Sequence, residues 1–100
     1  MRVGIEAGDR FFTGFSRDIS VDGMFVATQH GLKVGETVEV FFELPGGRSI
    51  NARGVVRRVR RGDGGRASGL GLRFEQLTRE ARVHIGRYVA RTLTGKIPLP

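Results

Sequence analysis

An alternation of apolar and polar residues with a period of two runs through the sequence as far as residue 74. Residues 37–44 read TVEVFFEL, with Val, Val, Phe and Leu at every second position. Because successive side chains of a strand point to opposite faces, this pattern predicts a strand with one buried face. The same reasoning predicts further short strands at residues 3–6, 11–19, 24–27, 48–59 and 68–74.

Turn signals separate the predicted strands. Pro45-Gly46-Gly47 follows one strand and Gly62-Asp63-Gly64-Gly65 follows another, and 16 of the 100 residues are glycine. Glycine adopts backbone conformations that tight turns need and that other residues avoid. Short strands at regular spacing with turns between them are typical of a closed barrel or a sandwich, and we predict an all-β, antiparallel barrel.

The hydrophobic period becomes helical after the last predicted strand. An amphipathic helix is predicted over about residues 76–93, with Thr78 as its N-cap and Glu80 in the first turn, where the helix dipole favours an acid. Gly95 and Pro98 mark its end. We expect the helix to pack over one opening of the barrel. Its apolar positions are Leu77, Ala81, Ile85, Tyr88 and Val89.

The length suits one domain with a modest core. We assign this domain to residues 1–93, with strands over about residues 2–74, and a C-terminal tail to residues 94–100. The sequence contains no cysteine, which favours a reducing, cytoplasmic setting. No apolar run approaches the ~20 residues of a membrane-spanning helix, and the first ten residues carry acids and glycines where a signal peptide would be apolar.

A carboxylate, a hydroxyl and a glycine follow one another closely at Asp18, Ser20 and Gly23. In a strand, Asp18 and Ser20 point to the same face. A carboxylate can accept the two neighbouring N–H donors of a guanine edge, and a hydroxyl beside it can donate or accept. Gly23 permits either a positive φ or the close approach of another group. Alternatively, the Asp and Ser side chains simply bond nearby backbone N–H groups in a turn.

The segment Asp18-Ile19-Ser20-Val21-Asp22-Gly23 resembles the D/N-x-S-x-x-G motif of the PilZ domain family. Segments 31–38, 42–45, 52–57 and 69–74 look like further parts of that family in the same order, so the likeness covers roughly residues 2–92. The resemblance implies a six-stranded antiparallel barrel with a C-terminal amphipathic helix.

In function, the resemblance implies a non-enzymatic bacterial signalling module that binds the second messenger cyclic di-GMP and passes the signal to a partner. It implies that Asp18 and Ser20 contact a guanine and that Gly23 keeps the turn open. No bound cofactor is implied beyond this ligand.

One motif of the family is missing from the sequence. PilZ domains carry two arginines, R-x-x-x-R, on an arm before the aspartate, and these arginines clamp the phosphates. No such pair precedes Asp18 here, so the arm is either absent from the protein or lies outside this sequence. Arg10 and Arg17, which we expect to contact phosphate, and Arg73 are the candidates to replace it.

Two hypotheses therefore remain open. The chain is either a cyclic di-GMP receptor that uses Asp18, Ser20 and Gly23, or a degenerate PilZ domain that does not bind the dinucleotide. In the second case it works by contact with another protein, for example in a motility or secretion apparatus.

Positive charge is the strongest feature of the composition, with a formal net charge of +7. It favours polyanionic partners such as nucleotides, nucleic acid or an anionic membrane surface. One stretch is especially basic and either forms a binding patch or consists of solvated strand ends that block edge pairing. Nucleic acid is the less favoured partner, because barrels that bind single strands stack bases on exposed aromatics and this stretch has none. Its arginines are Arg53, Arg57, Arg58, Arg60, Arg61 and Arg66.

Catalytic and metal-binding chemistry finds little support. The only two histidines are His30, expected in a loop, and His84, expected on the helix surface, and neither lies near other residues with metal-ligand spacing. Ser20 has no neighbouring histidine to activate it as a nucleophile. One predicted strand contains three phenylalanines, Phe11, Phe12 and Phe15. We expect two of these three side chains to lie in the core.

Overall fold

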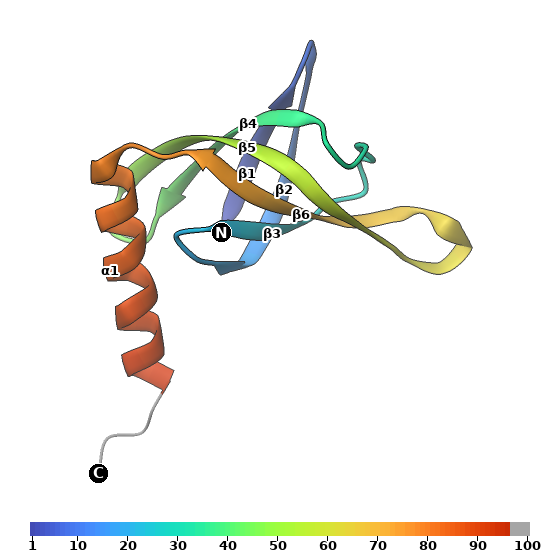
Figure 1. Cartoon of the computed structure of the whole chain (residues 1–100). Coiled ribbons are helices and arrows are strands. Elements are labelled where there is room, and N and C mark those ends of the chain that lie inside the picture. The colour runs from blue at the N-terminus through green and yellow to red at the C-terminus, as the bar shows by residue number, and fades with distance from the viewer. Residues whose placement is uncertain (97–100) are drawn as a thin grey trace.

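The structure is a computed structural model that describes residues 1–96, apart from the side chains of residue 17 and of residues 93–96. Six strands precede one C-terminal helix (Figure 1). A short 3-10 turn at Asp63–Gly65 joins the last two strands. The elements are β1 (Arg2–Ala7), β2 (Arg10–Ile19), β3 (Gly23–Ala27), β4 (Thr37–Leu44), β5 (Arg48–Arg61), β6 (Ala67–Gln76) and α1 (Arg79–Lys96).

The strands close a barrel in the order β1-β2-β3-β6-β5-β4, and all neighbouring pairs are antiparallel. The prediction of a six-stranded antiparallel barrel with a C-terminal helix is confirmed. The β4–β5 hairpin turns where the sequence indicated, since Gly46 and Gly47 have φ angles of 107° and 94°, which only glycine adopts readily.

Inward-facing side chains at alternate positions fill the barrel, and β2 shows one departure from our expectation. Only Phe12 of its three phenylalanines is buried, whereas Phe11 and Phe15 are 62% and 58% exposed. Both positions are an odd number of residues from Phe12, so they lie on the opposite, outer face of the strand. The expectation of two core phenylalanines in this strand was therefore wrong.

The helix packs across the end of the barrel where the β2–β3 and β4–β5 turns lie (Figure 1). Ala81 and Ile85 belong to the same buried cluster as the strand residues, and Ile85 is fully buried. On one flank Gly86 lies beside Val21 of the β2–β3 turn. On the other flank the helix borders the β4–β5 turn. This is the position expected from the amphipathic pattern.

The ends of the helix differ in detail from the prediction. Thr78 is confirmed as the N-cap, because its Oγ1 accepts a hydrogen bond of 3.0 Å from the backbone N–H of Ala81. The helix begins at Arg79, since β6 continues to Gln76, and it extends through Gly95 to Lys96. Of the predicted tail, residues 97–100 lie outside the described residues. Within residues 1–96, no helix has the length and apolar character needed to cross a membrane.

Candidate functional site

A β-bulge in β2 turns Asp18 to the outside of the barrel. Pairing with β3 is regular up to Ser16↔Val26 and resumes at Asp18↔Phe25, so residue 17 is an extra residue in the ladder. Ser16 faces the core at 3% exposure, and strict alternation would have turned residue 18 inward as well. The Ser16 hydroxyl donates to the Asp18 carbonyl oxygen across the bulge, at 3.2 Å.

The carboxylate of Asp18 is exposed, and no donor contacts it among the residues that the structure describes. It can therefore accept hydrogen bonds from a ligand. Arg17 occupies the bulge itself, and its side chain lies outside the described part of the chain.

Ser20 shapes the turn between β2 and β3. Its N–H donates to the carbonyl of Gly23 at 2.9 Å, and the N–H of Asp22 donates to its Oγ at 3.1 Å. Ser20 therefore forms the local side-chain hydrogen bond within the turn that the sequence suggested as the alternative to ligand binding. Because a hydroxyl also carries a donor, Ser20 can still donate to a ligand while its oxygen supports the turn.

Gly23 allows β3 and β6 to approach closely. A Cβ at this position would lie 2.0 Å from the carbonyl oxygen of Leu72 and 3.1 Å from the Cα of Arg73. The φ angle of Gly23 is not positive. Of the two roles that the sequence suggested for this glycine, close approach is the one observed. It places Arg73, which pairs with Gly23, directly beside the turn of residues 18–23 that joins β2 to β3, here called the Asp-Ser turn.

The outer face of β3, β6 and β5 carries an open depression of about 630 Å³. Ser20, Gly23 and Arg73 line it, together with Arg57 and Phe25. Asp18 borders the depression, since it pairs with Phe25 on the neighbouring strand. In the described part of the chain, neither arginine forms an ion pair or a side-chain hydrogen bond. Asp22 also lines the depression. The site thus combines two unpaired guanidinium groups with a hydroxyl, one acidic residue in its lining and the carboxylate of Asp18 at its border.

Sequence reasoning did not select Arg57 for this site. The residue belongs to the basic stretch, but its position depends on a second bulge, at which the β5–β6 pairing shifts between Val56 and Arg58. Nothing in the local sequence marks that shift, so only the pairing of the two strands shows that Arg57 lies near Ser20.

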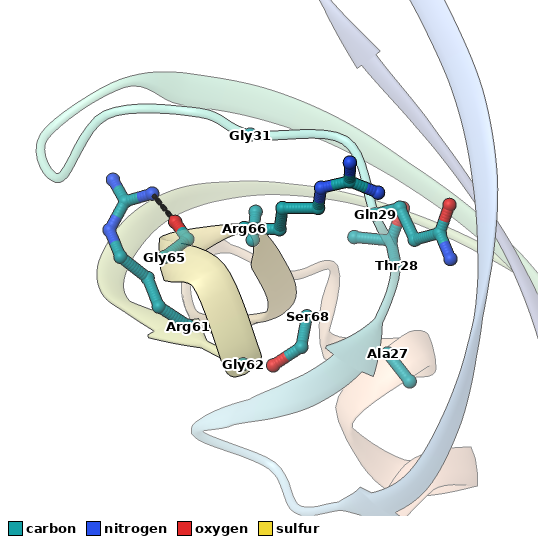
Figure 2. Close-up of a pocket in the computed structure, with 10 residues that line it drawn as sticks. Ala27, Thr28, Gln29, Gly31, Arg61, Gly62, Gly65, Arg66 and Ser68 are labelled. Carbon is teal, nitrogen blue, oxygen red and sulfur yellow. Dashed lines mark hydrogen bonds between the residues drawn. The ribbon is translucent and has the colours of Figure 1, made fainter.

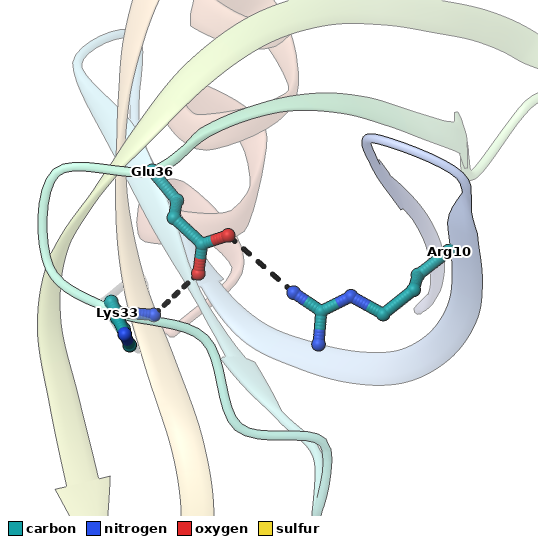
Figure 3. A network of polar contacts seen from close by, with 3 residues as sticks. All are labelled: Arg10, Lys33 and Glu36. Carbon is teal, nitrogen blue, oxygen red and sulfur yellow. Dashed lines mark hydrogen bonds and ion pairs between the residues drawn. The ribbon is translucent and has the colours of Figure 1, made fainter.

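Arg10, by contrast, does not join the site. It begins β2, eight residues before Asp18, which corresponds to roughly 26 Å along a strand. Its Nη2 forms an ion pair of 3.4 Å with Oε1 of Glu36, whose other carboxylate oxygen accepts a 2.6 Å hydrogen bond from the backbone N–H of Lys33 (Figure 3). Arg10 therefore links the start of β2 to the loop before β4, at the end of the barrel opposite the turn between β2 and β3.

The arginines of the basic stretch lie in different surroundings in the fold. Arg53 pairs with Glu39 at 3.0 Å, whereas Arg57 lines the depression. The guanidinium carbon of Arg60 lies 4.5 Å from the centre of the Phe25 ring. The stretch itself contains no aromatic residue, but the pairing of β3 with β6 brings Phe25 beside it. An aromatic ring and several free arginines are thus neighbours on this face.

A larger hollow of about 710 Å³ lies between the β3–β4 loop and the β5–β6 turn (Figure 2). Arg61 and Arg66 line it, and Nη1 of Arg61 donates to the carbonyl of Gly65 at 3.0 Å. Arg61 and Arg66 belong to the basic stretch, but none of the residues predicted to contact the dinucleotide lines this hollow. It lies at the end of the barrel away from the Asp-Ser turn, so the candidate site is the smaller depression.

The two histidines occupy different settings. His30 lies in the loop after β3, as expected, and its ring stacks on Phe12 with 4.6 Å between ring centres. His84 was expected on the helix surface, but its side chain is only 19% exposed because it packs beside the β4–β5 turn. The described residues contain no group of three potential metal ligands.

Comparison with known proteins adds to this geometry. The family model described as the PilZ domain matches residues 1–91. A solved structure titled as that of the Bacillus subtilis inhibitor of motility (MotI/DgrA) is similar, with a TM-score of 0.85 and 22% sequence identity. The similarity covers 97% of this chain and 48% of that one, so the chain spans about half the length of that protein. At this identity the likeness shows the fold. No curated protein matches the sequence.

Proposed function

The chain belongs to the PilZ domain family, whose members are non-enzymatic modules, and from this premise we propose that it is a receptor for cyclic di-GMP. In this proposal the dinucleotide binds in the depression on the outer face of β3, β6 and β5. Binding alters the surface that a partner protein contacts, and the protein acts in the cytoplasm, where the messenger is made.

One observation carries the proposal: two arginines without carboxylate partners line the same depression as Ser20, with Asp18 at its border. Asp18 would accept the N1–H and N2–H donors of a guanine, with the hydroxyl of Ser20 donating beside it. Arg57 and Arg73 would bind the two phosphates in place of the missing R-x-x-x-R arm, since charge-assisted bonds from guanidinium groups to phosphate are strong and directional.

Calorimetric titration of cyclic di-GMP into the wild type, Asp18→Ala and Arg73→Ala tests this function. We expect each substitution to weaken binding at least tenfold, because hydrogen bonds to charged groups contribute ~1.5–3 kcal/mol and each 1.4 kcal/mol is a factor of ten. Arg10→Ala is the matched control: it removes an arginine of the same strand as Asp18, at the far end of the barrel, and should leave the affinity unchanged. Wild-type protein that produces no heat up to millimolar ligand would refute the proposal.

A second candidate function is supported by the exposed aromatic side chains of β2. Phe11 and Phe15 stand on the outer face at 62% and 58% exposure, and the Phe11 ring lies over Gly4, where a Cβ would be only 3.0 Å away. Aromatic side chains are enriched where proteins contact one another. In this alternative the domain works without the dinucleotide, through a protein of a motility or secretion apparatus, in keeping with the name of the similar Bacillus subtilis protein.

Swimming assays separate the two candidates. The chain would be produced in Bacillus subtilis cells that lack their own inhibitor of motility. If protein contact suffices, Asp18→Ala inhibits swimming as well as the wild type does, whereas Phe11→Ser combined with Phe15→Ser abolishes inhibition. If the dinucleotide is required, Asp18→Ala abolishes inhibition. A wild-type chain without effect on swimming would exclude the motility form of the second candidate.

A further inference from the structure

Phe25 holds an unusual position on the outer face of the barrel. It lies in the middle of β3, with Asp18 opposite it on β2 and Gly71 opposite it on β6. Its ring covers Gly69: a Cβ on that glycine would lie 2.2 Å from Cζ and 2.7 Å from Cε1 of the ring. The absence of a side chain at position 69 therefore lets the ring lie flat against the sheet.

The guanidinium group of Arg60 lies over this ring. The guanidinium carbon of Arg60 lies 4.5 Å from the ring centre, and its Nε donates to Oγ of Ser68 at 3.2 Å. Arg60 is exposed, and it has no carboxylate partner among the residues described. A cation over an aromatic ring is held weakly at an exposed site, so a ligand can displace this guanidinium at little cost.

The strand register places complementary groups on both sides of the ring. Asp18, Phe25, Gly71 and Arg58 form one row across β2, β3, β6 and β5. Neighbouring strands lie about 4.8 Å apart, so the backbones at the two ends of the row are roughly 14 Å apart. Arg60 lies two residues beyond Arg58 on the same outer face of β5, and its guanidinium already reaches the Phe25 ring. The space between the Asp18 carboxylate and the base of this arginine therefore has about the width of a purine.

We propose that the Phe25 ring is a stacking surface for a guanine base of the ligand. Asp18 accepts the N1–H and N2–H donors at one edge of the base, and Arg60 moves off the ring to donate to O6 and N7 at the other edge. Arginine bonding to O6 and N7 is the commonest specific contact with guanine in the major groove of DNA. This inference rests on the proposed function and adds to it the groups that select the base. In the free protein, Arg60 covers the surface that the base occupies.

A proton NMR titration with cyclic di-GMP tests the stacking directly. The H8 proton of a guanine lying over a phenyl ring moves upfield, and calorimetry on the same samples gives the affinity. We expect an upfield shift with the wild type and with Phe25→Tyr, which keeps the ring. Phe25→Leu keeps an apolar cover over Gly69 but has no ring, so the shift should disappear and binding should weaken about tenfold or more.

The role of Arg60 is tested by comparing cyclic di-GMP with cyclic di-AMP. We expect the wild type to prefer the guanine dinucleotide strongly and Arg60→Gln to narrow that preference, because glutamine bonds well to the N6 and N7 of adenine. Arg66→Gln is the matched control: it removes an arginine of the same basic stretch that lines the other hollow, and it should leave the preference unchanged.

The outcomes separate this inference from the function on which it rests. Wild-type protein that binds cyclic di-GMP without an upfield H8 shift would overturn the stacking and leave the receptor function standing. Unchanged affinity in folded Phe25→Leu would do the same, and thermal unfolding of each variant shows whether it is folded. Wild-type protein that does not bind cyclic di-GMP would overturn both.

Discussion

Replacement of Gly23 by alanine should destabilise the barrel more than an ordinary surface substitution. The added Cβ would lie 2.0 Å from the carbonyl oxygen of Leu72, so β3 and β6 would have to separate by about 1 Å. Overpacking of this kind costs ~1–3 kcal/mol, and a weakened ladder hydrogen bond adds ~1 kcal/mol. We therefore expect Gly23→Ala to lower the free energy of unfolding by about 3 kcal/mol, a large share of the ~5–15 kcal/mol typical of a domain.

Urea denaturation followed by circular dichroism measures this loss, and thermal unfolding gives a second readout. For a domain of this size, 3 kcal/mol corresponds to a melting temperature lower by roughly 12–24 °C. Gly31→Ala is the matched control, because its Cβ would meet only Ala67 Cβ at an ordinary 3.7 Å. It should change stability by no more than about 0.5 kcal/mol. Equal denaturation midpoints for the two variants would refute the argument that close strand approach requires Gly23.

Three other substitutions test the packing around the site and the helix. Gly69→Ala should displace the Phe25 ring from the sheet and increase the exposure of that ring. The NMR chemical shifts of Arg60 should then change, because the ring no longer lies beneath the guanidinium group. Thr78→Ala should lower stability by ~1 kcal/mol through loss of the N-cap, as chemical denaturation would show; an unchanged midpoint would argue against the cap. Ile85→Ala should cost ~2–5 kcal/mol because the side chain is fully buried between α1 and the barrel, and a loss below 1 kcal/mol would contradict that burial.

Much of the fold could be predicted from the sequence because its signals are local. The period of two gave all the strands, and turn glycines such as Gly46 marked where β4 ends. Thr78 marked the start of the helix through a hydrogen bond that spans only three residues. The burial of the β2 phenylalanines was predicted less well. The sequence shows that Phe11 and Phe15 share a face, but the expectation followed their hydrophobicity rather than the strand's alternation.

The candidate site was predicted only in part. Ser20, Gly23 and Arg73 line one depression, and Asp18 borders it. Arg10 lies at the other end of β2, because residues near in sequence are far apart when the chain is extended. The closeness of Arg10 to Asp18 in sequence therefore said little about its distance from the ligand.

By itself, the sequence determined the alternation of the strands, the places of the turns, the helical face and the presence of an Asp-Ser-Gly motif. These features depend on residues a few positions apart in the sequence, whose interactions do not require contact with distant parts of the chain. The tertiary structure alone decided that a bulge turns Asp18 outward and that β6 approaches β3 closely at Gly23. It alone also decided that Arg57 and Phe25 lie beside Ser20. Those features depend on the register between strands, which is fixed only when the whole barrel closes and each strand has two partners.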